Sequence, residues 1–521
     1  TGPAMRSMAS PLRTRLSLQP LRATLPFIAY PGAIAAHWSR GKCTFKSPED
    51  DSAPTVAIDT SGLASHIRTG DGACGEEHTH ASGSNENPVQ RQLCSQIRFG
   101  GPISVAEFMN TALTHPQKGY YMQRDVFGSK GDFTTSPEVS QVFGELVGVW
   151  LVACWQQMGQ PSRVQLVEAG PGRGTLMADI LRASASFPSF QSALSVHFLE
   201  VSPFLRSAQR ETLERTAGAG TIMNTDDSDG EAPFVWRAAA ADSPPVSVRW
   251  HSSLDDIPNE NPLLLVGHEF LDALPIHQFC RTDKGWRERM VDVREHTAEA
   301  RRWASPVRSR SDKGHEAAAS AAAQAVPIRN LDEDSRVLDF VLAPSPTPAS
   351  ALFAPELPGD AEQAEVCPAA RAFTKQAAKR IRQFGGAALL IDYGDDRPPP
   401  DTLRGILQHR FVHPLHLPGE VDLSADVDFS ALRRVVRQAS PELRCPPLST
   451  QRDFLGAMGL EHRVRALLRT CTPPQRQALI EGAMRLVDEA GMGTAYKVFA
   501  FSHVSLGPQL PGFLPSSFTE P

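Results

Sequence analysis

Hydrophobic residues follow two periods between residues 97 and 502, and this pattern predicts helices that alternate with strands. Residues 139–155 and 176–185 carry apolar side chains at helical spacing, as do residues 105–109 nearer the N-terminus. Short apolar runs of strand length lie between and after these helices, at residues 164–167, 195–199, 246–250, 262–266 and 387–391. Strands separated by helices are typical of a mainly parallel sheet covered on both faces. We therefore expect a doubly wound α/β fold with an N-terminal helical extension.

Stretches with few large apolar residues interrupt or flank this pattern. Residues 49–96 are rich in Ser, Gly, His, Asp and Asn, which predicts a disordered linker. Residues 216–245 and 297–334 are interpreted as surface insertions. Residues 503–521 are expected to form a C-terminal tail. One domain at residues 97–502, with two inserted elements, accounts for the rest of the pattern.

The composition is that of an ordinary globular protein. The chain has 521 residues, 41% of them hydrophobic and 21% charged, with a formal net charge of −6. This balance indicates no nucleic-acid partner, and no apolar stretch approaches the ~20 residues that a transmembrane helix needs. The 8 cysteines are scattered without Cys-x-x-Cys spacing, so we expect neither a metal site nor a disulfide framework.

The N-terminal residues 1–48 differ from the rest of the chain in charge. They contain no Asp or Glu, while Arg and Lys side chains are spread among Leu, Ala, Ser and Thr. This composition is typical of an organellar transit peptide. A secretory signal needs a compact apolar core, and the only candidates are interrupted by Pro11, Pro20, Pro26 and Pro31. The alternative interpretation is a disordered basic tail.

A glycine-rich turn joins the first predicted strand of the sheet to a helix at residues 168–175. Gly170, Gly172 and Gly174 would let the backbone approach a ligand, because no Cβ stands in the way. Such a turn can cradle a nucleotide-like group. Glycine turns between a strand and a helix also occur for purely structural reasons, so the glycines alone leave both interpretations open.

Two acidic residues favour an adenosyl ligand. Glu200 ends the next strand, where a carboxylate can accept hydrogen bonds from both ribose hydroxyls. Glu168 lies immediately before the glycine turn, where it would repel a pyrophosphate but attract a cation. S-Adenosylmethionine carries a sulfonium cation and no phosphate. The turn therefore predicts an S-adenosylmethionine site more strongly than a dinucleotide site.

A second acidic pair follows the strand at residues 262–266. Glu269 and Asp272 are three residues apart, so a helical turn here would point them to the same side, next to the ligand's reactive end. Paired carboxylates there could hold a guanidinium group and orient one of its nitrogens. In the alternative interpretation Asp272 caps a helix and Glu269 is solvated. His268 and His277 are interpreted as structural residues.

The sequence resembles the MidA-like family of mitochondrial complex I assembly methyltransferases over roughly residues 97–502. The resemblance rests on the glycine turn, on residues 268–275, and on the segments 101–109, 115–121, 131–145, 340–344, 392–394, 402–405, 425–430 and 451–455. It implies a class I S-adenosylmethionine-dependent methyltransferase of the mitochondrial matrix. Residues 1–48 would then be a mitochondrial transit peptide.

The resemblance also implies a substrate. Enzymes of this kind symmetrically dimethylate an arginine on the 49 kDa core subunit of complex I, which promotes assembly of the complex. The three glycines take the role of the cofactor loop, and the segment containing Thr134 and Ser136 becomes a wall of the cofactor pocket. Two other functions stay open: a non-catalytic assembly chaperone that retains the methyltransferase fold, and a nicotinamide-dependent dehydrogenase.

Overall fold

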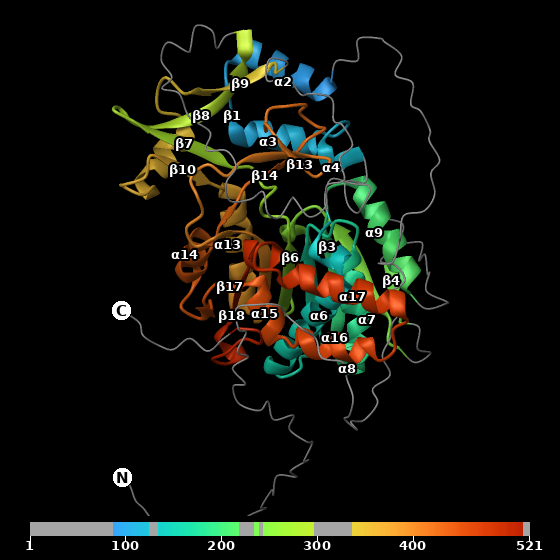
Figure 1. Ribbon diagram of the computed structural model, residues 1–521. Coiled ribbons are helices and arrows are strands. Elements are labelled where there is room, and N and C mark those ends of the chain that lie inside the picture. The colour runs from blue at the N-terminus through green and yellow to red at the C-terminus, as the bar shows by residue number, and fades with distance from the viewer. Residues whose placement is uncertain (1–86, 124–133, 218–233, 239–242, 296–335, 514–521) are drawn as a thin grey trace, which may run out of the picture. The chain divides into compact units, whose positions relative to one another are not determined.

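The computed structural model describes residues 87–123, 134–217, 234–238, 243–295 and 336–513. The expected transit peptide lies outside the described residues, as do most of the expected linker and the whole of the expected insertion at residues 297–334. Figure 1 shows the described residues in colour.

A large central sheet carries the parallel strands that the sequence predicts. Its order among the described residues is β16-β18-β11-β6-β2-β3-β5-β4. The strands from β11 to β5 run parallel, whereas β18 and β4 are antiparallel to their neighbours. The bounds are β2 Val164–Ala169, β3 Leu194–Leu199, β4 Phe234–Trp236, β5 Val246–His251, β6 Leu263–His268, β11 Gly386–Asp395, β16 Leu443–Arg444 and β18 Tyr496–His503. The predicted doubly wound α/β fold is confirmed.

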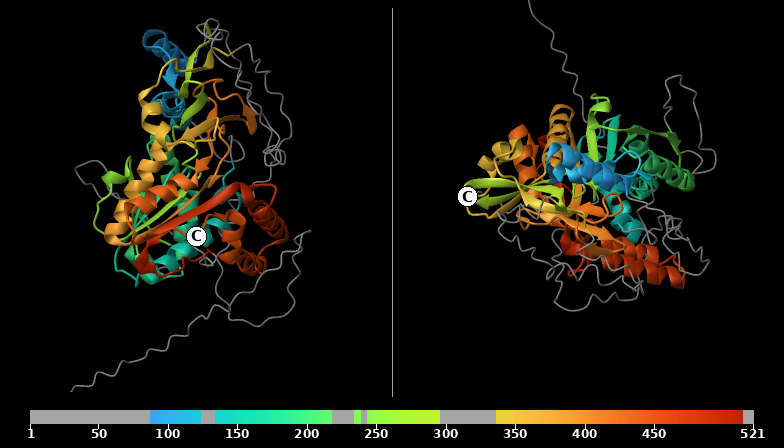
Figure 2. Two further views of the ribbon diagram at one scale, coloured as in Figure 1. Left: turned by 90° about the vertical axis from the view of Figure 1, so that its left-hand side faces the viewer. Right: turned by 90° about the horizontal axis from the view of Figure 1, so that it is seen from above.

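Helices cover both faces of this sheet (Figures 1 and 2). Leu263 and Leu265 of β6 belong to a core cluster with α13 and α14 on one face. His268 lies on the opposite face, because side chains alternate along a strand, and its ring packs on Phe143 of α6. The helices are α6 Gln141–Gln157, α7 Thr175–Ser184, α8 Pro188–Ala193, α9 Pro203–Thr216, α13 Pro368–Phe384 and α14 Phe429–Ala439.

A second, antiparallel sheet forms with the N-terminal helices. Its strands are β1 Ile103–Ser104, β7 His277–Thr282, β8 Gly285–Val293, β9 Leu338–Leu342 and β10 Gln363–Val366. Helix α3 (Val105–Thr114) begins at Ser104, whose hydroxyl accepts a hydrogen bond from the Glu107 amide. Phe108 and Met109 of α3 share one buried core with Val291 of β8. The sequence pattern did not predict this sheet, because charged residues such as Arg287, Glu288 and Arg289 of β8 interrupt its apolar runs.

A three-stranded sheet packs on the same core. Its strands are β12 Arg404–Leu407, β13 Arg410–Val412 and β14 Asp422–Ser424. Leu423 of β14 is buried in the cluster that contains α3. The short helix α4 (Tyr120–Gln123) belongs to this region and contacts both α3 and α9.

A helical segment separates the last two strands of the chain. It comprises α15 Gln451–Ala457, α16 Leu460–Leu468, α17 Pro473–Val487 and α18 Met492–Ala495, between β17 (Ser449–Thr450) and β18. Helix α16 contacts α6, and α17 contacts α5 (Ser136–Val139). Glu145 of α6 binds both Arg463 of α16 and Arg182 of α7 in ion pairs of 2.7 and 2.8 Å. The segment thus packs on helices α5 and α6 at one face of the central sheet, and the chain then returns to the sheet as β18.

Three boundary predictions are wrong in part. The last residues of the expected linker belong to helix α2 (Pro88–Gly100), because Asn87 caps it and Val89, Leu93 and Ile97 fall on one buried face. The expected insertion at residues 216–245 contains strand β4, which pairs with β5 and buries Phe234 and Trp236. The sequence pattern did not predict these elements, because α2 contains few large apolar residues and β4 is only 3 residues long.

The expected C-terminal tail is packed up to residue 513. Leu510 and Phe513 are buried, and the indole nitrogen of Trp150 donates a hydrogen bond of 3.1 Å to the Pro511 carbonyl. Isolated large apolar residues are enough to hold this segment against α6.

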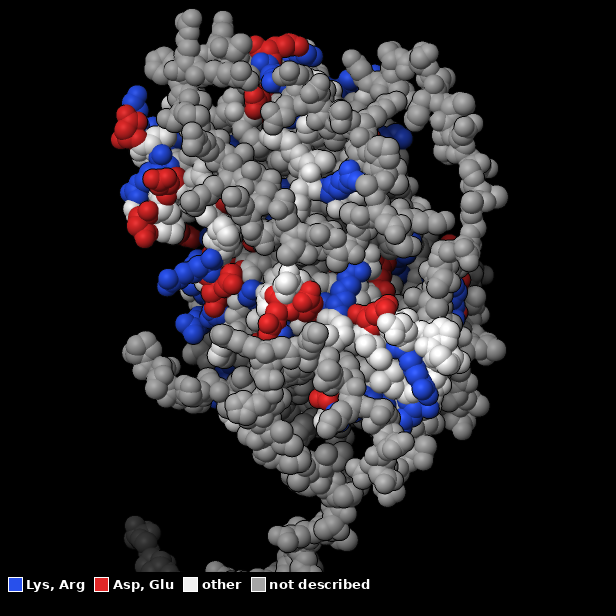
Figure 3. All heavy atoms as spheres, in the orientation of Figure 1, with Lys and Arg blue, Asp and Glu red and all other residues white. Residues whose placement is uncertain are grey.

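Across the described ranges, no helix combines the length and the apolar character that crossing a membrane requires. Where described side chains are visible on the face in Figure 3, Lys and Arg are interspersed with Asp and Glu.

Candidate active site

The glycine turn connects β2 to α7 at the carboxyl edge of the parallel sheet. Gly170, Gly172 and Gly174 have φ angles of 65°, 52° and 78°. These values lie in the left-handed region, which glycine adopts without steric cost. Gly174 also stands at the N-cap of α7. The three glycines are therefore required by the backbone path of the turn.

Gly170 also makes room for a neighbouring side chain, which the sequence did not predict. A Cβ added at Gly170 would lie 2.4 Å from the Cβ of Phe270, and one added at Gly267 would lie 2.5 Å from the same ring. Phe270 belongs to the loop after β6. The missing side chain of Gly170 thus admits Phe270 rather than leaving room for a ligand. As a result, the loop after β6 packs directly on the glycine turn. This loop carries Glu269 and Asp272 and is called the acid loop below.

Glu168 lies at the end of β2 with 2% of its surface exposed. Its Oε2 atom has no hydrogen-bond partner among the described residues. Burial raises the pKa of this carboxyl well above its usual range. An approaching cation would lower that pKa again by stabilising the carboxylate. Glu168 is therefore suited to a cationic or hydrogen-bond-donating ligand.

Glu200 directly follows β3 and is linked to the glycine turn through a buried glutamine. Its carboxylate accepts hydrogen bonds from the Ser202 amide at 2.8 Å and from Gln209 Nε2 at 3.0 Å. The same Gln209 nitrogen donates to the Gly172 carbonyl at 2.8 Å, while its oxygen accepts from the indole of Trp250. Gln209 was not predicted, because a single glutamine on a helix carries no sequence signal.

The loop after β6 does not form the helical turn that the sequence suggested. Glu269 has a φ of 51°, which is uncommon for a residue with a side chain. The carboxylate of Asp392, fully buried near the carboxyl end of β11, accepts hydrogen bonds from the amides of Phe270, Leu271 and Asp272 at 3.1, 2.8 and 3.3 Å. A carboxylate from the neighbouring strand therefore holds this loop in place of a helix.

Glu269 is enclosed by polar groups from several elements. Its Oε1 accepts a hydrogen bond of 3.3 Å from the Ser136 amide and lies 3.3 Å from His268 Nε2, and the carboxylate is also bonded to the Tyr496 hydroxyl. Burial and the nearby Asp272 raise the pKa of Glu269 to about 8. Burial lowers the pKa of His268 to about 3, so this imidazole is neutral. The interpretation of Glu269 as a solvated residue is wrong.

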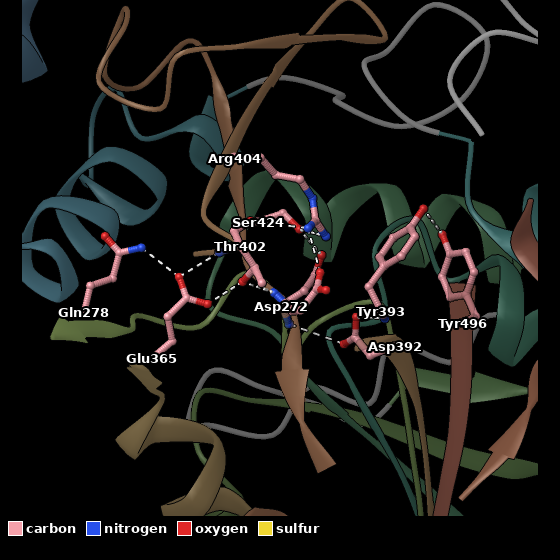
Figure 4. A network of polar contacts seen from close by, with 10 residues as sticks. Asp272, Gln278, Glu365, Asp392, Tyr393, Thr402, Arg404, Ser424 and Tyr496 are labelled. Atoms are coloured by element: carbon pink, nitrogen blue, oxygen red, sulfur yellow. Dashed lines mark hydrogen bonds and ion pairs between the residues drawn. The ribbon is translucent and has the colours of Figure 1, made fainter. Parts of the chain in front are cut away.

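Asp272 has a different environment (Figure 4). Its Oδ2 accepts a hydrogen bond of 2.8 Å from the Ser424 hydroxyl, and the Arg404 guanidinium interacts with it electrostatically. Arg404 forms an ion pair of 2.6 Å with Asp426 and lies over the ring of Tyr393 at 5.4 Å. No helix begins at Asp272, so its interpretation as a helix cap is also wrong. Asp272 has a cation close by, whereas the charges nearest Glu269 are acidic.

The segment with Thr134 and Ser136 reaches both loops. Ser136 is fully buried, and its hydroxyl donates a hydrogen bond of 3.1 Å to Gln451 Oε1. Glu138 of the same short helix lies 3.5 Å from Arg173 of the glycine turn. Thr134, which is half-buried, precedes this helix. The contacts of Ser136 thus run to Glu269 and Gln451.

His277 lies apart from these loops on the second sheet. Its Nδ1 atom is 2.6 Å from Glu288 Oε1. Its interpretation as a structural residue agrees with this position. The described residues contain no group of three or more His, Cys, Asp and Glu side chains arranged to hold a metal ion.

Comparison with known proteins places the chain in a family. Residues 146–445 match the model of a family described as "Putative S-adenosyl-L-methionine-dependent methyltransferase". The chain belongs to this family. The strands of the central sheet up to β16, the glycine turn and the acid loop lie within the matched residues, whereas β18, α5 and the helical segment α15–α18 lie outside them.

Curated relatives cover most of the chain. The protein arginine methyltransferase NDUFAF7, mitochondrial, of Mus musculus is 39% identical, over 82% of this chain and 88% of its own length. The Homo sapiens protein of that name is 38% identical, over 80% of this chain and 84% of its own length. The Drosophila melanogaster homologue is 38% identical, over 80% and 85%.

Two solved structures from Burkholderia thailandensis share the fold. One contains S-adenosyl-homocysteine; it has a TM-score of 0.59 and 22% identity, and the match covers 88% of this chain and 97% of that chain. The other has a TM-score of 0.58 and 24% identity, over 89% and 98%.

The residues around the glycine turn fit the family's cofactor, S-adenosyl-L-methionine. Its sulfonium and amino group are positive, and its ribose hydroxyls are hydrogen-bond donors. The buried and unpartnered Oε2 of Glu168 suits a cation or a donor, and the carboxylate of Glu200 has further lone pairs beyond those used by Ser202 and Gln209. The predicted cofactor is confirmed by the family.

Proposed function

We propose that this chain is a mitochondrial protein arginine methyltransferase. The observation that carries the proposal is the acidic pair of Glu269 and Asp272 on a loop that packs through Phe270 against the glycine turn. Two carboxylates beside a methyl donor suit a cationic acceptor that can be bound bidentately, such as a guanidinium group. The curated relatives, which carry this activity and this organelle in their names, support the proposal.

Glu168 and Glu200 hold the cofactor in this proposal, together with the backbone of the glycine turn. When bound, the cofactor supplies a methyl group on a sulfonium sulfur. In this role Glu168 donates no proton, and its carboxylate offsets the positive charge of the cofactor. Because burial raises its pKa, cofactor binding should weaken as the pH falls and Glu168 takes up a proton.

Glu269 and Asp272 orient the acceptor arginine. A free guanidinium is protonated at neutral pH, since its pKa is above ~12, and one nitrogen must expose its lone pair before a carbon–nitrogen bond can form. Asp272, with Arg404 close by, anchors the guanidinium. Glu269 receives the proton that the methylated nitrogen releases, because a carboxyl with a raised pKa is a better base than an ordinary one.

The finer proposal concerns the product and the substrate. We propose symmetric dimethylation of an arginine on the 49 kDa core subunit of complex I in the mitochondrial matrix, which promotes assembly of the complex. The resemblance to the MidA-like family supports this substrate, and the acid-free composition of residues 1–48 supports a mitochondrial address.

Mass spectrometry of complex I subunits, with and without this protein, tests the proposal. The expected result is the loss of one symmetric dimethylarginine from the 49 kDa subunit when the protein is absent. Arginine methylation that persists unchanged on every subunit would contradict it. Restored complex I assembly with a variant that cannot bind the cofactor would instead support a non-catalytic chaperone.

A further inference from the structure

Strand β18, near the C-terminus of the chain, places a tyrosine beside the acid loop. Tyr496 begins β18 directly after the helical segment α15–α18, and it is paired in register with Tyr393 of β11. Paired residues of neighbouring strands share one face of a sheet. Their ring centroids are 4.1 Å apart and their hydroxyl oxygens 2.7 Å apart. Figure 4 shows the two hydroxyls facing each other.

The Tyr496 hydroxyl also contacts Glu269. The two side chains are hydrogen-bonded, and only 1% of the Tyr496 surface is exposed. A tyrosine hydroxyl can donate one hydrogen bond while accepting another. In the free protein the Tyr496 hydroxyl donates to the Tyr393 hydroxyl. Because a hydroxyl can rotate, Tyr496 can turn its proton to Glu269 when that carboxylate is ionised and then accept from Tyr393. The parallel ring of His268, at an interplanar angle of 3°, fixes the Tyr496 ring from one side.

A second contact reaches Glu269 from the same helical segment. Gln451 at the start of α15 is fully buried; its Nε2 donates to the Leu486 carbonyl, and its Oε1 accepts from the Ser136 hydroxyl. The Ser136 amide in turn donates to Glu269. Gln451 thus holds Ser136, which contacts the same carboxylate that Tyr496 approaches from the other end of the segment.

The backbone of Glu269 makes such support necessary. Its φ of 51° is a left-handed conformation that costs free energy for a residue with a side chain. Its amide is fixed by a hydrogen bond of 2.9 Å to the Ile391 carbonyl. The amides that follow are fixed by Asp392, so the backbone is held independently of the carboxylate. The orientation of the carboxylate itself depends on side chains from other elements.

We propose that Tyr496 is a positioning residue of methyl transfer, whose hydroxyl holds the Glu269 carboxylate toward the acceptor nitrogen and favours its ionised form. This inference rests on the proposed function, because it assigns Glu269 to the acceptor. It places part of the acceptor site in a segment beyond the residues that the family model matches.

The charged and titratable groups that face Glu269 come from four elements and the acid loop. They are Glu138 of α5, His268 of β6, Asp272 of the loop, Asp392 and Tyr393 of β11, and Tyr496 of β18. The acids raise the pKa of Glu269, whereas the hydrogen bonds from Tyr496 and the Ser136 amide lower it. Removing the Tyr496 hydroxyl should therefore raise the pKa of Glu269 further.

The test is Tyr496→Phe in the full chain, with two independent readouts. Infrared difference spectra against Glu269→Gln follow the protonation of Glu269, and a methylation assay uses the recombinant 49 kDa subunit. Loss of a hydrogen bond to a charged group should move the Glu269 midpoint up by about one pH unit. The acid limb of the pH profile of the methylation rate should move upward by the same amount. The rate should then be roughly tenfold lower near neutral pH and recover in part at higher pH, while the KM for S-adenosylmethionine stays unchanged.

Two variants serve as comparisons. Tyr393→Phe removes the neighbouring hydroxyl and should give a smaller shift in the same direction, which keeps the test open if Tyr496→Phe does not fold. Tyr120→Phe changes another buried tyrosine, in the N-terminal core, and should move neither midpoint. An unchanged Glu269 midpoint in both network variants would overturn the inference. A shifted midpoint without any methylation by the unmodified protein would support the positioning but contradict the proposed function.

Discussion

The two acidic loops at the carboxyl edge of the sheet are built in different ways. The glycine turn after β2 takes its shape from neighbouring residues, because Gly170, Gly172 and Gly174 supply the positive φ angles themselves. The loop after β6 bends at Glu269, a residue that does not favour this conformation, and it is held by Asp392 from another strand. One loop is locally determined, and the other depends on the rest of the fold.

The carboxylates of the two loops differ accordingly. Glu168 is surrounded by the core of the sheet, and burial alone raises its pKa. Glu269 is surrounded by other ionisable groups, and its pKa is raised by burial and by Asp272 but lowered by hydrogen bonds from Tyr496 and Ser136. A single buried acid suits a fixed cation, whereas a hydrogen-bonded network suits a group that gains and loses a proton. Variants in the two loops should therefore fail in different ways.

The largest effect is expected from Glu269→Gln. The amide keeps the size of the side chain but cannot receive a proton, so the methylation rate should fall about a thousandfold. The affinity for S-adenosylmethionine, measured by calorimetry, should stay nearly unchanged. Methylation at the normal rate would show that Glu269 does not serve the acceptor.

Gly172→Val should give the reciprocal result. A β-branched side chain at a φ of 52° distorts the turn, so cofactor affinity should fall about a hundredfold or more. Calorimetry with S-adenosylmethionine measures this loss, and the thermal unfolding curve provides a control for folding. If this variant kept its affinity, the turn would not be the cofactor loop, and the two loops could not be separated by function.

A third difference concerns the stability of the free protein against pH. The pKa of Glu269 rises from 4.5 in the unfolded chain to about 8 in the folded protein, so the folded state binds the proton more tightly. This stabilisation is complete at pH values below 4.5, the pKa in the unfolded chain, and is lost as the pH rises through 8. Between pH 6 and 7.5 the protein should lose about 2 kcal/mol more than Glu269→Gln. Urea unfolding at both pH values measures the difference; equal losses would contradict the raised pKa.

The smallest effect concerns the contact between the loops. Gly170→Ala places a Cβ against Phe270 and strains the turn, so it should destabilise the fold. Phe270→Gly removes the opposing Cβ together with the ring, whereas alanine would keep the Cβ that causes the clash. In a double-mutant cycle the two substitutions should be coupled by about 1 kcal/mol, with the double variant more stable than the sum of the single effects predicts. Strict additivity would mean that the two loops do not pack on each other.

Much of the cofactor side could be predicted from the sequence. The run of apolar residues before the turn, the three glycines and the acids Glu168 and Glu200 are local signals, and the structure places them at the ends of β2 and β3. The acceptor side was predicted only as two carboxylates. Their expected helical turn was wrong, because hydrogen bonds to Asp392 replace the backbone bonds of a helix.

The sequence by itself determined the alternating strands and helices of the parallel sheet, the positive φ angles of the glycine turn and the acids at the strand ends, because these depend on residues close together in the chain. Only the tertiary structure decided that Phe270 fills the space beside Gly170, that Gln209 joins Glu200 to the turn, and that Tyr496 reaches Glu269. These contacts join residues far apart in sequence. No local period or spacing encodes them, since they arise only when the parallel sheet brings its strand ends together.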